Sequence, residues 1–370
     1  MNRLRLVLLL FVILLLVSAG VVVWTFREMR VPVAHARAEE YIEIPRGSSP
    51  DQITQILTSA GVIRRPLLFK IYLRVSGSAS RLKAGEYRFV SPISPLSVLA
   101  KLEAGEQRLK RFTVVEGWTR WDIAERMAQV PEFKFQNTSE ALSLLDDTSL
   151  IRDIDPEAQN LEGYLYPDTY NFPPDTTPRE FVALMVKRFR QVWDGRMAER
   201  ARMLNKSARE VLTVASLIET EAKLKEERPV ISSVIYNRLR IGMALGVDST
   251  VIYASKLAGK WRDDGKVYQS DLDRVSPYNT RRVRGLPPGP IASPGESSID
   301  AALNPATTDY LYYVREPARD DGAHNFYSSE AEFARGVAAL REWERARDAR
   351  AAEAIPTPTS TPTPTPTPLQ

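Results

Sequence analysis

Apolar residues follow a helical spacing between Val211 and Leu239, and the pattern predicts two consecutive helices. The first apolar stripe consists of Val211, Leu212, Val214, Ala215 and Ile218, and it ends at Glu219. The second consists of Val230, Ile231, Val234, Ile235 and Leu239. Pro229 suits the first turn of the second helix because its φ is fixed, and Gly242 marks the stop. A charged link containing Glu221, Glu226 and Glu227 separates the two helices.

Glu219 lies where the apolar face of the first predicted helix gives out, which makes it a candidate proton donor. A carboxyl group at such a position is partly shielded from water, and shielding disfavours its ionised form. A group that holds a proton near neutral pH can act as a general acid. We therefore expect Glu219 to exchange protons with a substrate.

An uninterrupted apolar run from Leu6 to Phe26 has about the length needed to cross a bilayer. Arg3 and Arg5 precede it, and Trp24 lies near its far end, where interfacial aromatics are common. We expect residues 1–30 to form a cytoplasmic tip and a single membrane anchor, with everything after them outside the cytoplasm. The alternative is a cleaved signal peptide, which the length of the run disfavours.

Residues 40–106 are predicted to form a LysM-like α+β domain of the order strand, helix, helix, strand. The strands are expected at 41–44 and 85–90, the first helix around Ile53 to Leu57, the second at 66–75 and a further helix at 95–104. A weak repeat at an offset of seventy residues places FTVVEGWTRWDIAERM in register with the first strand and helix. This second copy looks like the opening of a LysM module, so residues 107–160 are a possible second LysM-like unit; a common strand-turn-helix is the alternative.

The remaining segments predict an α+β domain over residues 107–345. We expect an Arg-rich surface helix at 178–203, a hairpin from strands at 310–314 and 324–327, and a helix at 333–350. The last stretch, residues 351–370, is rich in Thr and Pro and should form a disordered spacer.

Composition excludes several classes of function. The 370 residues include no cysteine and only His35 and His324, so disulfides, thiolate metal sites and histidine-rich metal centres are not expected, and no cofactor is implied. The net charge is +4, and the basic residues are spread along the chain. Since no nucleic-acid-binding motif is present, the charge indicates an ordinary basic surface.

Several long motifs in order closely resemble the endolytic murein transglycosylases, the MltG or YceG-like family. They are LEGYLYPDTY, ASLIETEA, SVIYNRLRIGM, DSTVIYA, SPYNTRRVRGLPPGPIASPG and ALNPA, and the resemblance covers about residues 40 to 345. It implies a peptidoglycan lyase in which Glu219, the first glutamate of ASLIETE, is the catalytic acid/base. Gly246 replaces an expected polar residue and Ser249 an expected proline. Both departures concern the substrate groove.

Other polar and aromatic residues in these motifs are candidates for substrate binding. Aromatic rings stack on sugars, and carboxylates accept hydrogen bonds from hydroxyl groups. The candidates are Glu162, Tyr164, Glu221, Asn237, Arg238, Asp248, Tyr253, Tyr278, Asn279 and His324. For Glu162 and Tyr164 a packed, capped turn is an equal alternative. For His324 a surface or capping position is the favoured alternative, because a lone histidine more often occupies such a position.

The number of carboxylates bears on the reaction. Hydrolytic glycosidases usually employ two, whereas no partner for Glu219 is evident, and Glu221 would face another way on a helix. Other carboxylates are possible partners but could equally be binding or surface groups: Glu162, Asp168, Glu227 and Asp248. A lytic transglycosylase needs one, because the C6 hydroxyl of N-acetylmuramic acid attacks C1 of the same sugar and leaves a 1,6-anhydro end. The alternatives are a lysozyme-type hydrolase and a non-catalytic glycan-binding scaffold.

The resemblance also implies a location and partners. The expected substrate is the glycan strand of nascent peptidoglycan, cut internally between N-acetylmuramic acid and N-acetylglucosamine so that elongation ends. Peptidoglycan synthases are the expected protein partners. Together with the apolar run, this places the protein in the cell (inner) membrane, single-pass, with its catalytic domain outside the cytoplasm.

Overall fold

A computed structural model describes residues 2–105, 107–262 and 264–353. The chain divides into two compact units, and neither is continuous in sequence. Unit 1 comprises residues 1–113, 128–136 and 169–181, and unit 2 comprises residues 114–127, 137–168 and 182–370. The Thr/Pro-rich tail from residue 354 onward lies outside the described residues.

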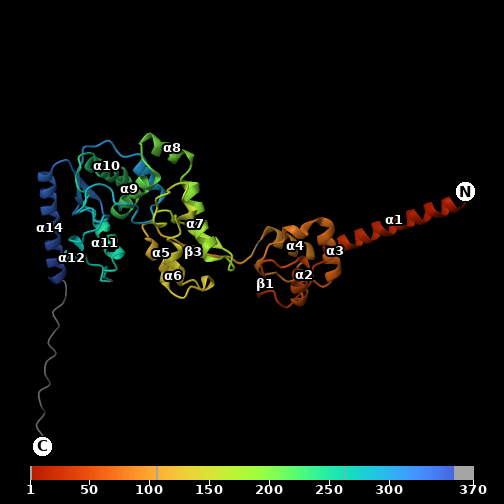
Figure 1. The fold of residues 1–370 in the computed structure, drawn as a ribbon. Helices are drawn as coiled ribbons and strands as arrows, with labels where there is room; N and C mark the ends of the chain where they lie inside the picture. The colour runs from red at the N-terminus through yellow and green to blue at the C-terminus, as the bar shows by residue number, and fades with distance from the viewer. Residues whose placement is uncertain (1, 106, 263, 354–370) are drawn as a thin grey trace, which may run out of the picture. The chain divides into compact units, whose positions relative to one another are not determined.

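Unit 1 begins with α1 (Asn2–Glu28). Its remaining elements are β1 (Ile42–Ile44), α2 (Pro50–Ser59), α3 (Pro66–Ser76), η1 (Ser78–Arg81), β2 (Gly85–Tyr87), α4 (Pro95–Ala104), β3 (Lys110–Thr113), η2 (Pro131–Phe133) and β4 (Thr169–Phe172). The strands form two antiparallel pairs, β1 with β2 and β3 with β4. Figure 1 shows α2, α3 and α4 gathered in the orange part of the chain.

Helices α3 and α4 of unit 1 lie within one residue of their predicted bounds, and α2 contains the predicted helix around Ile53 to Leu57 but is longer. Ser49 caps α2 through a reciprocal pair of hydrogen bonds with Gln52, and Pro50 occupies the first turn. Gly105 ends α4 in the left-handed conformation. Ile44, Leu57, Phe69 and Tyr87 are among the fully buried side chains that join these elements into one core. The predicted strand–helix–helix–strand order is therefore confirmed, while its kinship to LysM modules stays a prediction.

Helix α1 contains the predicted apolar run. Among the described residues, no helix has both the length and the apolarity that a membrane span requires.

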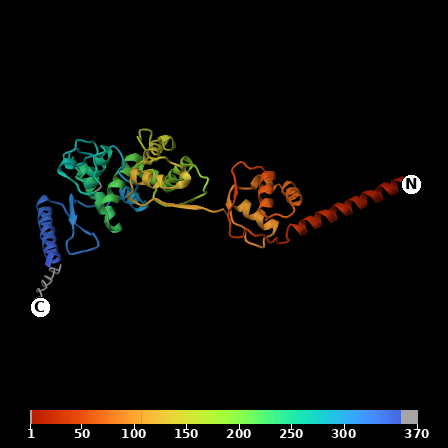
Figure 2. The same cartoon turned by 90° about the horizontal axis from the view of Figure 1, so that it is seen from below.

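Unit 2 contains most of the motif residues. Its elements are α5 (Arg120–Ala128), α6 (Thr138–Leu144), η3 (Thr148–Leu150), α7 (Pro178–Val192, which begins in unit 1), α8 (Gly195–Met203), α9 (Ala208–Glu221), η4 (Lys225–Glu227), α10 (Arg228–Arg240), α11 (Asp248–Leu257), α12 (Gln269–Leu272), α13 (Glu296–Leu303), β5 (Tyr312–Arg315), β6 (His324–Tyr327) and α14 (Glu330–Glu353). β5 and β6 form the predicted antiparallel hairpin, and α14 packs against it (Figure 2).

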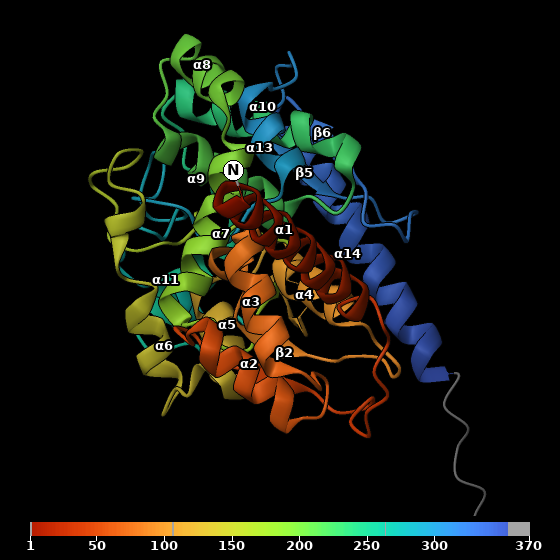
Figure 3. The same cartoon turned by 90° about the vertical axis from the view of Figure 1, so that its right-hand side faces the viewer.

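Helix α9 is the central element of unit 2, and it packs against α8, α10, α11 and α13 (Figure 3). Ser207 caps its start together with Glu210. Every residue from Val211 to Ile218 is buried, including Thr213 and Ser216. A helix buried on all sides has little room to shift, so it holds the residues at its end in fixed positions.

One predicted helix was wrong. The helix expected at 178–203 is two helices, α7 and α8, because Asp194 accepts a hydrogen bond from the Met197 N–H and starts a new helix. The buried stretch of α9 stops at Ile218, just before Glu219 as predicted, and the helix itself continues to Glu221.

Candidate active site

The carboxylate of Glu219 lies at the buried end of α9. Arg228 donates from Nη2 to Oε1 over 2.9 Å, and the Gly295 N–H donates to Oε2 over 2.9 Å. The Glu219 side chain is only 5% exposed and that of Arg228 only 6%. One partner is a cation and the other a backbone donor, so both carboxylate oxygens are held in fixed directions.

Arg228 is the first residue of α10, and its guanidinium lies next to the end of α9. It also contacts Ser297 Oγ on α13. A second carboxylate, Glu116, has Oε2 at 3.9 Å from the same Nη2, and its side chain is half exposed. Arg228 thus lies between a buried glutamate and an accessible one.

The segment around Glu116 is fixed by backbone hydrogen bonds. The Gly117 N–H donates to the Ser293 carbonyl over 2.9 Å, and the Ser293 N–H donates to the Trp118 carbonyl over 2.8 Å. Gly117 has φ of +81°, which glycine adopts without strain. Glu116 was not predicted as a site residue; its only signal in the sequence is the Glu-Gly turn of the VVEGW string.

Glu221 occupies separate surroundings from Glu219. Tyr313 on β5 donates from its hydroxyl to Glu221 Oε2 over 2.9 Å. Burial raises the pKa of Glu221; the Tyr313 hydrogen bond opposes this effect, and the charge of Asp248 adds to it. Asp248 itself is exposed and pairs with Arg281, whose Nε lies 2.7 Å from Oδ1.

His324 at the start of β6 is tied to Glu227. Its backbone N–H donates to Glu227 Oε1, and its Nδ1 lies 2.8 Å from Oε2. The His324 side chain is 14% exposed. The structure therefore gives this histidine a defined carboxylate partner beside the ring of Tyr313.

Asn237 and Arg238 on α10 bind the backbone of neighbouring segments. Asn237 donates from Nδ2 to the carbonyls of Thr308 (2.9 Å) and Tyr310 (3.0 Å). Arg238 donates to the carbonyls of Leu311 (2.6 Å) and Leu245 (2.5 Å). The contacts with Thr308, Tyr310 and Leu311 hold the segment that leads into β5 against α10.

Glu162 forms a second buried carboxylate site in unit 2. Both of its oxygens accept from the Arg120 N–H at 3.1 Å. Burial raises the pKa of Glu162 from 4.5 to about 7. The Tyr253 ring lies near it and packs against Tyr278 at 4.8 Å between ring centroids.

Two other predicted site residues bind locally. Tyr164 is fully buried and donates from its hydroxyl to Asp155 over 2.6 Å. Asn279 donates from Nδ2 to the carbonyls of Leu272 and Arg274. The structure thus brings Glu162, Tyr253 and Tyr278 together, whereas it commits Tyr164 and Asn279 to contacts inside the fold.

Two cavities of unit 2 border these residues. One has about 160 Å³ and is lined in part by Gly117, Thr220, Ser249 and Tyr253. Thr220 follows Glu219 in the sequence, and a Cβ built on Gly117 would lie 4.0 Å from Cγ of Glu219. Ser249, the residue in place of proline, shares a hydrogen bond with Thr220 there. The other has about 270 Å³ and is lined in part by Glu162 and Tyr278.

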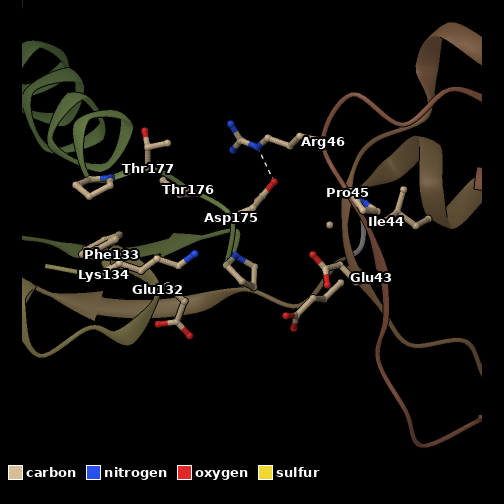
Figure 4. Close-up of a pocket in the computed structure, with 14 residues that line it drawn as sticks. Glu43, Ile44, Pro45, Arg46, Glu132, Phe133, Lys134, Asp175, Thr176 and Thr177 are labelled. Carbon is tan, nitrogen blue, oxygen red and sulfur yellow. Dashed lines mark hydrogen bonds and ion pairs between the residues drawn. The ribbon is translucent and has the colours of Figure 1, made fainter. Parts of the chain in front are cut away.

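A larger cavity than these two lies away from all of the predicted site residues. It has about 580 Å³, lies within unit 1 and is lined in part by Arg46, Glu132 and Asp175. Figure 4 shows Arg46 reaching Asp175, with Nε to Oδ2 at 2.5 Å. Cavity size alone therefore does not locate the candidate active site.

The family model described as YceG-like family matches residues 42–339. A relative from Bacillus subtilis (strain 168), named endolytic murein transglycosylase, is 37% identical over 290 residues, covering 74% of this chain and 78% of the relative. One of the same name from Streptococcus pneumoniae serotype 2 (strain D39 / NCTC 7466) is 30% identical over 310 residues, covering 76% of this chain. The match covers 55% of that relative, so the chain spans about half its length. A crystal structure of a YceG-like protein from Listeria monocytogenes has a TM-score of 0.54 at 32% identity, covering 81% of this chain and 99% of that one.

Proposed function

Because the chain belongs to the YceG-like family, as its motifs predicted, we propose that it is an endolytic murein transglycosylase with Glu219 as its acid/base. The observation that carries this proposal is the position of Glu219. It follows the buried stretch of α9 that ends at Ile218, and its two oxygens are oriented by Arg228 and Gly295. Proton transfer to a bound glycan requires a carboxylate in a fixed position next to a cavity, and Glu219 meets this requirement.

Glu219 acts twice in the proposed reaction. Protonated, it gives its proton to the glycosidic oxygen between N-acetylmuramic acid and N-acetylglucosamine, and that bond breaks. As a carboxylate, it then takes the proton of the C6 hydroxyl, whose oxygen forms the bond to C1 of the same sugar. The nucleophile is internal, so no water is consumed and the proximity advantage is large. The product is a 1,6-anhydro end.

A lysozyme-type hydrolase on the same polymer is the second candidate, and one observation favours it. Glu116 supplies the second carboxylate that the sequence analysis did not find, 3.9 Å from the guanidinium that Glu219 binds. Two carboxylates flank the scissile bond in most glycoside hydrolases.

Product analysis distinguishes the two reactions. Purified murein is digested with the full-length protein, and the fragments are separated and weighed by mass spectrometry. The transglycosylase yields anhydro ends, and each is lighter by one water than the reducing end that a hydrolase leaves. Reducing ends alone would assign the hydrolase, and intact murein would leave only a non-catalytic glycan-binding scaffold.

Membrane attachment through α1 is part of the same proposal. Support comes from the apolar run in the sequence and from the apolar side chains exposed along the helix, among them Leu8, Phe11, Leu14 and Leu16. Isolated apolar side chains are common on surfaces, but a helix that exposes them over several turns needs an apolar partner. We place the N-terminus in the cytoplasm and the rest outside it, where nascent glycan strands and peptidoglycan synthases would be the partners.

A further inference from the structure

The surroundings of Glu219 oppose one of its two proposed roles, that of proton donor. A general acid must hold a proton before it can donate one. Yet Arg228 lies 2.9 Å from Glu219 Oε1, and both side chains are nearly inaccessible to water. Protonating Glu219 would therefore leave the Arg228 guanidinium buried with its closest charge partner neutralised, which is costly.

Glu116 is placed to relieve that cost. Its Oε2 lies 3.9 Å from the same Arg228 Nη2, beyond an ideal hydrogen bond but within reach of a small side-chain movement. The Glu116 side chain is half exposed, so it can move without losing buried contacts. The backbone next to Glu116 is held in place, because the Gly117 N–H donates a hydrogen bond to the Ser293 carbonyl.

We propose that Glu116 is a positioning residue that takes over the Arg228 guanidinium when Glu219 takes up its proton, so that Glu219 can act as the acid. This inference rests on the proposed function. The proton comes from solvent and passes to the glycosidic oxygen, and Arg228 stays charged throughout. When Glu219 becomes a carboxylate again, Arg228 returns to it.

Gly295 makes the exchange sterically possible. A Cβ built on Gly295 would overlap the Glu116 carboxylate oxygen Oε1, so the glycine leaves the space that Glu116 occupies. The φ of Gly295 is −74°, which any residue adopts. The missing side chain, rather than backbone freedom, therefore accounts for glycine here, and the same residue donates its N–H to Glu219.

The other titratable groups near this end of α9 are mostly held by partners of their own. Glu221 accepts from Tyr313, Glu227 binds His324, Asp248 pairs with Arg281, and Lys256 lies 3.5 Å from Asp122. Glu296 at the start of α13 acts through its charge on Tyr166. Among the groups of unit 2 that the structure describes, Glu116 is the second carboxylate within ion-pair distance of Arg228.

The test is the pH profile of murein cleavage by the full-length protein carrying Glu116→Gln. Removing the negative charge makes protonation of Glu219 harder, so the alkaline limb should move to lower pH by roughly one unit. At a pH on that limb the rate then falls about tenfold, with KM for murein unchanged. Glu125→Gln, an exposed carboxylate of α5, is the matched control and should keep the wild-type profile.

A second variant removes the Glu116–Arg228 interaction by steric exclusion. Gly295→Ala retains the N–H that binds Glu219 but displaces the Glu116 carboxylate, so it should shift the limb in the same direction. The double variant should shift it no further, because both changes remove one interaction. Thermal melts exclude unfolding as the cause.

A Glu116→Gln profile that coincides with the wild type, in protein that melts normally, would overturn the inference. So would a lowered rate that is the same at every pH, which is the mark of a merely structural role. Failure of the proposed function looks different, because wild-type protein would then produce no anhydro ends at any pH.

Discussion

Glu219 and Arg228 form a buried ion pair between the end of α9 and the start of α10. The Oε1 to Nη2 distance is 2.9 Å, and the two side chains are 5% and 6% exposed. A pair so little exposed is stable only while both partners are present, because either one alone is a desolvated charge. The pair therefore links the folding of these two helices to the geometry of the acid/base.

Replacing Arg228 by methionine should cost stability as well as activity. We expect the free energy of unfolding to fall by about 3–5 kcal/mol, because the Glu219 carboxylate is left buried without its cation. Urea unfolding measures the loss. Arg281→Met is the control: its pair with Asp248 is exposed, so its loss should stay under about 1 kcal/mol. Equal losses in the two variants would show that the buried Glu219–Arg228 pair contributes no more to the free energy of unfolding than the exposed pair does.

The pH dependence of stability should carry a contribution from Glu162. Burial raises its pKa from 4.5 to about 7, so the native state binds more protons than the unfolded state between these values. Stability from this group is complete below about pH 4.5 and is lost as pH rises through about 7. At pH 8 the penalty is roughly 3 kcal/mol.

Glu162→Gln removes that titration while keeping a carbonyl oxygen for the Arg120 N–H. We expect urea unfolding to show similar stability for variant and wild type near pH 4, and a more stable variant, relative to wild type, at pH 8. A difference between the two proteins that does not vary with pH would contradict the assignment.

Gly163 should resist substitution because of its close approach to the Pro-rich segment. Its φ is +81°, and a Cβ built on it would lie 2.6 Å from Cβ and Cγ of Pro290. Gly259 also has a positive φ, +60°, but its Cβ would meet nothing within 4 Å. Both alanine variants bear backbone strain, and Gly163→Ala should lose a further ~1–3 kcal/mol through the overlap. Urea unfolding of the two variants gives the difference, and equal losses would contradict it.

The anchor proposal predicts that the mature, membrane-extracted protein keeps Leu6 to Phe26. N-terminal sequencing after detergent extraction measures this directly. A mature start between Val31 and Ala38 would indicate a cleaved signal peptide and would remove the proposed attachment.

Local pattern was enough to predict most elements of the fold. Helices α4 and α9 and strand β6 were expected from apolar periodicity, caps and turn residues, which act over a few positions. The break between α7 and α8 was missed because Asp194 and Gly195 interrupt an otherwise amphipathic run only briefly, and the capping bond that starts α8 was not recognised.

The candidate site was only partly predictable for a different reason. Glu219 was marked by the end of an apolar stripe and by the family motif. Its contacts Arg228 and Gly295, and the nearby Glu116, come from three separate segments that tertiary packing brings together. No short-range pattern joins them. Asn237 and Arg238 show that a family motif can also mislead: both were proposed to bind substrate, and in the structure both donate to backbone carbonyls.

The central claim is that Glu219 is the acid/base, and the yield of anhydromuropeptides from two variants tests it most directly. Glu219→Gln keeps the shape of the side chain but cannot supply or take the proton, so the yield should fall by roughly a hundred- to ten-thousand-fold. Glu221→Gln should lose far less, because that carboxyl is bound to Tyr313 and not to Arg228. Glu221→Gln should melt as the wild type does, whereas Glu219→Gln should melt at a lower temperature but still cooperatively, because the buried Arg228 loses its closest charge partner. Retained glycan binding below that temperature shows that the Glu219→Gln variant is folded when its activity is measured. An active Glu219→Gln beside an inactive Glu221→Gln would contradict the account.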